Sequence, residues 1–206
     1  MESPNDHTLA AYNENVLAYK KNTPQDIKSH SQRMLEWINE SLSYLPPHGK
    51  VFEIGSATLR DASYIRERGF VVTCSDAAIG FVNDLRAQGE QALVLNVLKD
   101  RIPQGYDMIF ANSVFHHFTD DDANRAIAQI SAALEPGKIF SFCVRVGSGE
   151  TWVSEKFADK RYVHFWNVDT LVPLLWKNGF EVLLTSSNIG NFPDHLWLNI
   201  IARKRS

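Results

Sequence analysis

From residue 51 onward the sequence alternates between short apolar runs and amphipathic stretches, and this alternation limits the possible folds. Apolar runs typical of β-strands cover residues 51–55, 70–76, 92–96, 106–111 and 138–145. Stretches with helical spacing of apolar residues cover 59–68, 79–88 and 120–134. Strands that alternate with helices form parallel pairs joined by right-handed crossovers, and the helices cover both faces of the sheet. The pattern therefore predicts an α/β three-layer sandwich with a mostly parallel sheet.

The C-terminal part of the sequence predicts a different strand pairing. A helix is expected over residues 168–178, followed by strands over 180–187 and 195–203. Only a short segment with the sequence Gly-Asn-Phe-Pro separates these two strands. A connection this short favours an antiparallel pair.

The N-terminal part is polar and precedes the first predicted strand. Tyr12 and Tyr19 are two helical turns apart, so both side chains can lie on one face of a helix over residues 9–21. A second helix is predicted to begin with Thr23 as N-cap and Pro24 at its first position, and to end before Pro46. We expect residues 1–45 to form a helical cap segment and residues 46–206 to form one compact domain.

Composition and charge narrow the range of partners. The 206 residues include 44% apolar and 22% charged residues, with a net charge of -3, which does not favour nucleic acid or anionic lipid as a partner. The sequence contains neither an apolar run of about 20 residues nor a secretion signal, so we expect a cytoplasmic protein with no membrane association. Cys74 and Cys143 lie in predicted strands, which favours buried thiols over a metal site or a disulfide.

In open α/β sheets a ligand binds outside the carboxyl ends of the strands, so the residues that follow each strand are the candidates for a site. Gly55 follows the first strand and allows close approach of the backbone to a ligand, and the next helix offers free N–H groups at its start, near Ser56. Asp76 ends the second strand, about 20 residues after Gly55. An acid at this spacing commonly binds the ribose hydroxyls of a nucleotide-like cofactor.

The next two strand ends also carry polar side chains. Asn96 ends the third strand, where its amide can contact an adenine amino group. Asn112 follows the fourth strand, and His116 and His117 come shortly after it. Histidine is suited to general base catalysis near neutral pH, although these two side chains could equally be packing or solvated imidazoles.

These motifs, taken in order, resemble those of the class I S-adenosylmethionine-dependent methyltransferases. The motifs are Glu53-x-Gly55, Asp76, a polar residue at Asn96, Tyr106-Asp-Met-Ile-Phe110, His116-His117, and Leu134-Glu-Pro-Gly-Lys138. The resemblance covers essentially the whole chain. It implies a three-layer Rossmann-like sandwich with a seven-stranded, mostly parallel sheet whose last strand is antiparallel.

Within that superfamily the chain is most similar to small stand-alone members. The segments that carry this similarity are Tyr12 and Tyr19, Arg60-Asp61, Gly147-Ser-Gly-Glu150 and Arg161-Tyr-Val-His-Phe-Trp166. The resemblance implies that S-adenosyl-L-methionine contacts Tyr12, Tyr19, Glu53, Gly55, Ser56, Arg60, Asp76, Ala77, Asn96, Val97 and Asn112. It implies His116 and His117 as catalytic candidates, with His116 the leading base, and Arg145, Glu150, Arg161 and Tyr162 as contacts of a small-molecule substrate.

The implied reaction is methyl transfer to a nitrogen or oxygen nucleophile of a small molecule. The first loop departs from the glycine pattern of the family, since Ala57 and Leu59 stand where glycine is usual, and Asn96 replaces a common acid. A non-catalytic binding or scaffold protein with a degenerate glycine loop is therefore an alternative. A nicotinamide-dependent oxidoreductase is a second alternative, which the absence of a third glycine and of a Tyr-x-x-x-Lys pair disfavours.

Overall fold

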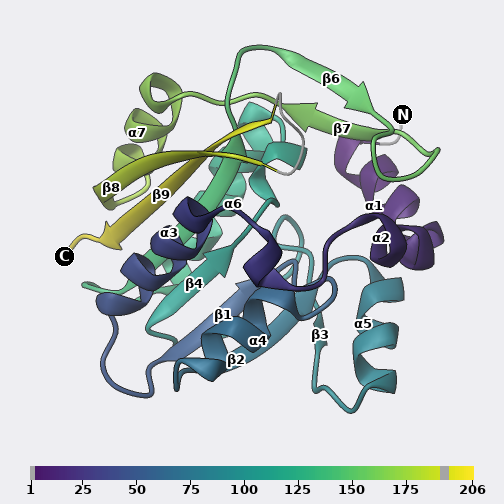
Figure 1. Ribbon diagram of the computed structural model, residues 1–206. Coiled ribbons are helices and arrows are strands. Elements are labelled where there is room, and N and C mark those ends of the chain that lie inside the picture. Colours follow the sequence, from purple (N-terminus) through teal and green to yellow (C-terminus); the bar gives the residue numbers. More distant parts are fainter. Residues whose placement is uncertain (1–2, 191–194) are drawn as a thin grey trace.

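The computed structural model describes residues 3–190 and 195–206 (Figure 1). Within these residues, seven strands form one sheet in the order β3-β2-β1-β4-β5-β9-β8. Their bounds are β1 Lys50–Ile54, β2 Val71–Asp76, β3 Leu93–Val94, β4 Met108–Ala111, β5 Ile139–Arg145, β8 Phe180–Ile189 and β9 Leu196–Lys204. The first five strands pair in parallel, and β9 is antiparallel to both β5 and β8. The predicted fold class and the antiparallel last strand are confirmed, while most of the Gly-Asn-Phe-Pro segment lies outside the described residues.

Helices cover both faces of the sheet and give it a two-sided core. The helices α3 Gln32–Ser43, α4 Arg60–Glu67 and α5 Ile79–Ala87 pack on one face, and α6 Asp120–Ala133 and α7 Val168–Lys177 pack on the other. All seven residues of β5 are buried, as expected of a central strand between two helical layers. No helix in the described ranges is both long enough and apolar enough to span a membrane.

The start of α3 differs from the prediction. Thr23 is not an N-cap but follows α2 (Val16–Asn22) as its C-cap, and its hydroxyl has no hydrogen-bond partner among the described residues. The 3-10 turn η1 Ile27–Ser29 comes first, and α3 begins after Ser31, whose hydroxyl accepts a hydrogen bond from the N–H of Met34. Ser29, His30 and Ser31 are poor helix formers that favour caps and turns, so the helix begins only where the apolar face of α3 begins.

The N-terminal segment is helical, as predicted, but it is broken in the middle. The helices α1 Pro4–Glu14 and α2 Val16–Asn22 meet at Asn15, whose φ of -120° and ψ of 27° are not helical. The rings of Tyr12 and Tyr19 lie side by side, with 5.8 Å between their centroids. Because α3 packs on the sheet with the core helices, the part of the predicted cap segment that lies outside the three layers is residues 4–22.

The segment between β5 and α7 contains a β-hairpin. The strands β6 Glu150–Val153 and β7 Arg161–His164 pair in antiparallel orientation, separate from the main sheet. The hairpin lies beside α1 (Figure 1), where the N–H of Tyr162 donates to the hydroxyl of Thr8. Trp152 and Tyr162, the aromatic residues of the two strands, are cross-strand partners with 5.7 Å between their ring centroids.

Candidate functional site

A cavity of about 360 Å³ lies at the carboxyl ends of the strands. Along the sheet it extends from Asn96, after β3, to Asn199 on β9. Tyr12 of α1 and Tyr19 of α2 line its opposite wall. The volume falls within the range typical of small-molecule pockets, and the position is the one expected for a ligand of an open α/β sheet.

The loop after β1 approaches the cavity with a strained backbone. Gly55 has a φ of 77°, and a side chain there would place its Cβ 2.5 Å from Val114 Cγ2. Ala57 and Leu59 also have positive φ values, of 42° and 65°. The loop therefore has left-handed conformations even at the two positions that depart from the glycine pattern, at a cost of about 1–2 kcal/mol for each residue with a side chain.

Asp76 holds the first loop against the end of β2. Its carboxylate accepts hydrogen bonds from the N–H groups of Ala57 at 3.0 Å and Ala78 at 2.8 Å. Burial raises the pKa of Asp76 to about 6, although the N–H groups of Ala78, Ala57 and Ala77 act in the opposite direction. The carboxylate lines the cavity and has lone pairs left for further donors.

Asn96 lies at the β3 end of the cavity and is held by three contacts. Its side-chain oxygen accepts from the N–H of Leu98, its side-chain amide donates to Asn5 of α1, and its own N–H donates to Asp100. Leu95, Val97 and Phe81 line the cavity beside it, as does Ala77. An apolar slot with an amide at its rim can receive a flat heteroaromatic ring.

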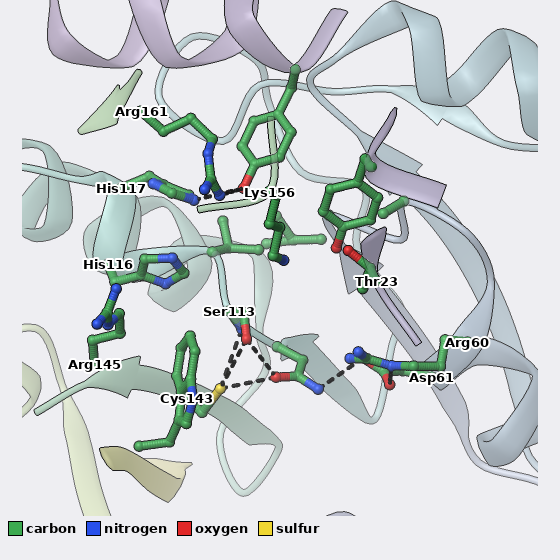
Figure 2. Close-up of a pocket in the computed structure, with 18 of the residues that line it drawn as sticks. Thr23, Arg60, Asp61, Ser113, His116, His117, Cys143, Arg145, Lys156 and Arg161 are labelled. Atoms are coloured by element: carbon green, nitrogen blue, oxygen red, sulfur yellow. Dashed lines mark hydrogen bonds and ion pairs between the residues drawn. The ribbon is translucent and has the colours of Figure 1, made fainter. Parts of the chain in front are cut away.

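A network of polar side chains fixes the cavity wall near β4 and α4 (Figure 2). Arg60 forms a bidentate ion pair with Asp61, through Nε at 2.7 Å and Nη2 at 2.9 Å. Asn112 donates to the same carboxylate at 2.8 Å and accepts from Ser113 and from the thiol of Cys143. Because each group is held by another, this wall is preorganised.

A chain of hydrogen bonds connects the β6–β7 hairpin to α1 and η2 (Phe115–His117). Nδ1 of His117 donates to the carbonyl oxygen of Tyr162 at 2.6 Å, so its Nε2 carries the lone pair. The hydroxyl of Tyr12 donates to that Nε2 at 2.9 Å and accepts from Nη1 of Arg161 at 3.1 Å. Burial, together with the charge of Arg161, lowers the pKa of His117 to about 3. His117 is therefore neutral, and its lone pair is already engaged.

His116 has a different environment from its neighbour. Its side chain is buried and lines the cavity, and its Nδ1 has no hydrogen-bond partner among the described residues. Burial and the neighbouring His117, Arg145, Lys156 and Arg161 keep the pKa of His116 well below its ordinary value. This imidazole is neutral at physiological pH and can accept a proton or a hydrogen bond from a bound molecule.

Most of the predicted site residues line this cavity, and three do not. The residues that line it are Tyr12, Tyr19, Gly55, Ser56, Arg60, Asp76, Ala77, Asn96, Val97, Asn112, His116, His117, Arg145 and Arg161. Glu53 is buried below the cavity, where burial and the nearby Asp61 raise its pKa. Glu150 and Tyr162 hydrogen-bond to each other on the hairpin and lie outside the lining.

The cavity also contains residues that the sequence did not single out. Lys156 and Glu155 come from the segment between β6 and β7, and Trp197 and Asn199 come from β9. Asn199 stands alone among the apolar residues of β9, and that polar interruption was a usable signal. No comparable signal marks Lys156, because nothing in a charged segment indicates which side chain turns inward.

Most of the chain matches one family of known proteins. The family described as "Methyltransferase domain" matches residues 25–185. No curated protein sequence matches the chain.

Several solved structures are similar to this fold. The 1,6-didemethyltoxoflavin-N1-methyltransferase of Burkholderia thailandensis, solved with 1,6-didemethyltoxoflavin and S-adenosylhomocysteine, is 19% identical. Its TM-score is 0.75, over 100% of this chain and 92% of that one. An S-adenosylmethionine-dependent methyltransferase of Methanosarcina mazei has a TM-score of 0.66 at 18% identity, over 79% and 95% of the two chains. The N-methyltransferase NodS of Bradyrhizobium japonicum, solved with S-adenosylhomocysteine, has a TM-score of 0.64 at 16% identity, over 85% and 87%.

Proposed function

Because the chain belongs to the methyltransferase domain family, it is an S-adenosylmethionine-dependent methyltransferase, and we propose that it methylates a nitrogen or oxygen nucleophile of a small molecule. One observation carries this proposal. A single cavity has the Asp76 carboxylate toward its β2 side and the unpartnered Nδ1 of His116 toward its β4 side. A nucleotide-like donor and a nucleophilic acceptor can therefore lie in one enclosed space. The two structural relatives solved as N-methyltransferases agree with this class of acceptor.

The residues of the first half of the cavity fit the cofactor. A side chain at Gly55 would collide with Val114, so the absence of one lets the loop pass close to this cavity residue. The free lone pairs of Asp76 suit the two hydroxyls of a ribose, and the slot beside Asn96 and Val97 suits an adenine. Asp61 holds Arg60 and Asn112 in the cavity wall, and we propose that these two residues bind the amino acid end of the cofactor.

The chain itself contributes alignment and exclusion of water. S-adenosylmethionine supplies a methyl group on a positively charged sulfur, and that sulfur is also the leaving group. The rings of Tyr12, Tyr19 and Phe81 pack together over the cavity, with 5.1 Å between the centroids of Tyr19 and Phe81. Aromatic faces are compatible with a nearby positive charge, and they exclude water that would compete with the acceptor.

His116 is the residue that we propose as the general base. A neutral imidazole with a free nitrogen can take the proton that a nitrogen or oxygen nucleophile loses when it is methylated. His117 is a weaker candidate, since Tyr12 already donates to its lone pair. We propose instead that His117 positions Tyr12 and the hairpin, so the two adjacent histidines have separate roles.

The helices α1 and α2 are proposed to act as a cap. They reach across the cavity and are fastened to elements on its rim. Asn5 bonds to Asn96, Thr8 to the hairpin, and Lys20 of α2 to Asp84 of α5. The rings of Tyr12 and Tyr19 also pack on Phe81, so the contacts of the cap are both polar and aromatic. We propose that the cap detaches to admit a ligand and closes again when one is bound.

The proposed function is tested with labelled cofactor. The enzyme is incubated with a panel of small metabolites and S-adenosylmethionine that carries a ¹³C-methyl group, and products are identified by mass spectrometry. We expect the label on a nitrogen or oxygen atom of a small molecule. Label on carbon, or label only on protein or nucleic acid included in the panel, would contradict the proposal. A reaction without enzyme and a reaction with Asp76→Ala are the controls.

A further inference from the structure

The half of the cavity near the hairpin holds more positive charge than the chain neutralises. Lys156 enters from the segment between β6 and β7 and lies near the middle of the cavity (Figure 2). Its ammonium is 4.4 Å from the centre of the Tyr19 ring. Among the described residues, no carboxylate forms an ion pair with it. Burial and the charges of Arg161 and Arg60 lower the pKa of Lys156 to about 8, which leaves it mainly protonated at neutral pH.

Arg161 is the second cation, and it has unused donors. The side chain is buried, with 3% of its surface exposed. Nη1 donates to Tyr12, while Nε and Nη2 have no hydrogen-bond partner among the described residues. The nearest carboxylate oxygen, of Glu155, is 3.9 Å from Nη2, which is too far for a hydrogen bond. Buried guanidinium donors are costly to leave unpaired, so these two point to a missing acceptor.

Glu155, the carboxylate near Arg161, already has other partners. Its Oε1 lies 3.1 Å from Nη1 of Arg145 and 3.1 Å from Nε2 of His195. This carboxylate is therefore paired with Arg145, lies 3.9 Å from Arg161 and forms no ion pair with Lys156 among the described residues, so it does not neutralise all three cations. The two buried histidines beside them are neutral, which agrees with an excess of positive charge around them.

We propose that the methyl acceptor carries a carboxylate or phosphate group, and that Lys156 and Arg161 bind this group. The inference rests on the proposed function, because it describes the acceptor of that same reaction. Both groups offer several oxygen acceptors, which can satisfy the two free donors of Arg161 and the ammonium of Lys156 together. Bound in this way, the acceptor is held by its acidic end beside His116. The adjacent neutral imidazole is then available for the nucleophilic atom.

The test measures binding of matched acids and neutral compounds to the protein. Binding of S-adenosylhomocysteine is measured first by calorimetry. The complex is then titrated, with ligand-observed NMR, against small aromatic and aliphatic carboxylic acids and their primary amides. Phosphate monoesters and their parent alcohols form the second arm of the panel. The variants are Lys156→Met and Arg161→Met, and the control is Lys160→Met, which removes an exposed charge from the same segment.

We expect acids or phosphate monoesters to bind at least about tenfold more tightly than their neutral counterparts. Each of the two variants should remove this preference, while Lys160→Met keeps it. Binding in the acid arm alone assigns a carboxylate, and binding in the ester arm alone assigns a phosphate. Because Lys156 lies on a surface segment, Lys156→Met should fold, and this variant tests the proposal if Arg161→Met does not fold.

Three results would overturn the inference. Neutral compounds could bind as tightly as their acids, the variants could keep the preference, or no acid or ester could bind while S-adenosylhomocysteine does. A tenfold loss of S-adenosylhomocysteine affinity in both variants would also overturn it, since the cations would then bind the cofactor carboxylate. Failure of the first titration in the wild-type protein counts against the proposed function instead. In that case the same acids, esters and neutral compounds are titrated against the cofactor-free protein, and their binding tests the anion site on its own.

Discussion

The carboxylate of Asp76 should make cofactor binding depend on pH. In the free protein, burial raises the pKa of Asp76 to about 6, against an ordinary value of 3.8. Two ribose hydroxyls that donate to the carboxylate favour its ionised form, so binding should return the pKa toward the ordinary value. The two values differ by a free energy of about 3 kcal/mol. The ionised form binds, so affinity should be highest above pH 6 and fall as the pH drops through 6.

The size of the effect follows from linkage between proton and ligand binding. Below pH 6, the affinity for S-adenosylhomocysteine should fall about tenfold per pH unit until the carboxyl of the complex itself becomes protonated. Isothermal titration calorimetry at pH 7.5, 6.0 and 5.0 measures this decrease. Repeating the titration at pH 5.0 in buffers of different ionisation enthalpy should show that nearly one proton is released for each ligand bound.

Asp76→Asn separates this carboxyl from the other titrating groups. The variant should bind S-adenosylhomocysteine more weakly at pH 7.5, by about 1.5–3 kcal/mol, because it loses a charge-assisted pair of hydrogen bonds. Its affinity should then stay constant between pH 7 and 5. A wild-type affinity that is equally constant over this range, or a variant with the same slope as the wild type, would refute the assignment of Asp76 to the ribose.

The same carboxyl has the opposite effect on folding of the free protein. Its folded pKa lies above that of the unfolded chain, so the folded state binds the proton more tightly. The contribution of Asp76 to stability is therefore fully present below about pH 4 and is lost as the pH rises through 6. Urea unfolding of wild type and Asp76→Asn at pH 5 and pH 7.5 should show a smaller difference between the two proteins at pH 5.

Three further predictions concern the loop, the cap and the base. Ala57→Gly should raise the free energy of unfolding by about 1 kcal/mol, because glycine relieves the positive φ. Leu59→Gly should lower the melting temperature measured by calorimetry, because Leu59 packs on the core, and should leave the affinity for S-adenosylhomocysteine unchanged. A large gain in affinity for Leu59→Gly would show a degraded pocket instead. Residues 9–21 should exchange amide hydrogens more slowly with S-adenosylhomocysteine bound, and equal exchange in both states would mean that Tyr12 and Tyr19 have only a packing role. Deletion of residues 1–22 should reduce methyl transfer strongly while it changes the stability of the fold little. His116→Gln should lower kcat by about 100-fold or more with cofactor affinity intact, and a variant that retains kcat would exclude His116 as the base.

Much of the cavity was predictable from the sequence, because ligands of open α/β sheets bind at the carboxyl ends of the strands. Gly55, Asp76, Asn96 and Asn112 each follow a strand of the parallel sheet, and the topology brings them to one edge. Local spacing was sufficient here, because strands and helices of ordinary length leave little freedom at these positions.

Residues whose placement depends on tertiary contacts were harder to predict. Glu150 and Tyr162 satisfy each other on the hairpin instead of facing the cavity, and Lys156 turns inward between them in the sequence. The false start at Thr23 has a similar origin. The local signal at Thr23 predicted the start of the helix, but burial of the α3 face places that start after Ser31.

The position of β9 has a consequence for how the molecule is assembled. This strand, residues Leu196–Lys204, hydrogen-bonds to β5 on one side and to β8 on the other, although it follows both of them in the sequence. During synthesis on the ribosome, β5 therefore remains an open, apolar edge while more than fifty further residues are added. The β8–β9 hairpin can form locally and then dock on β5 in one step. We expect nascent chains that lack residues 196–204 to aggregate through β5, and the sheet to be completed only once this segment has left the ribosome.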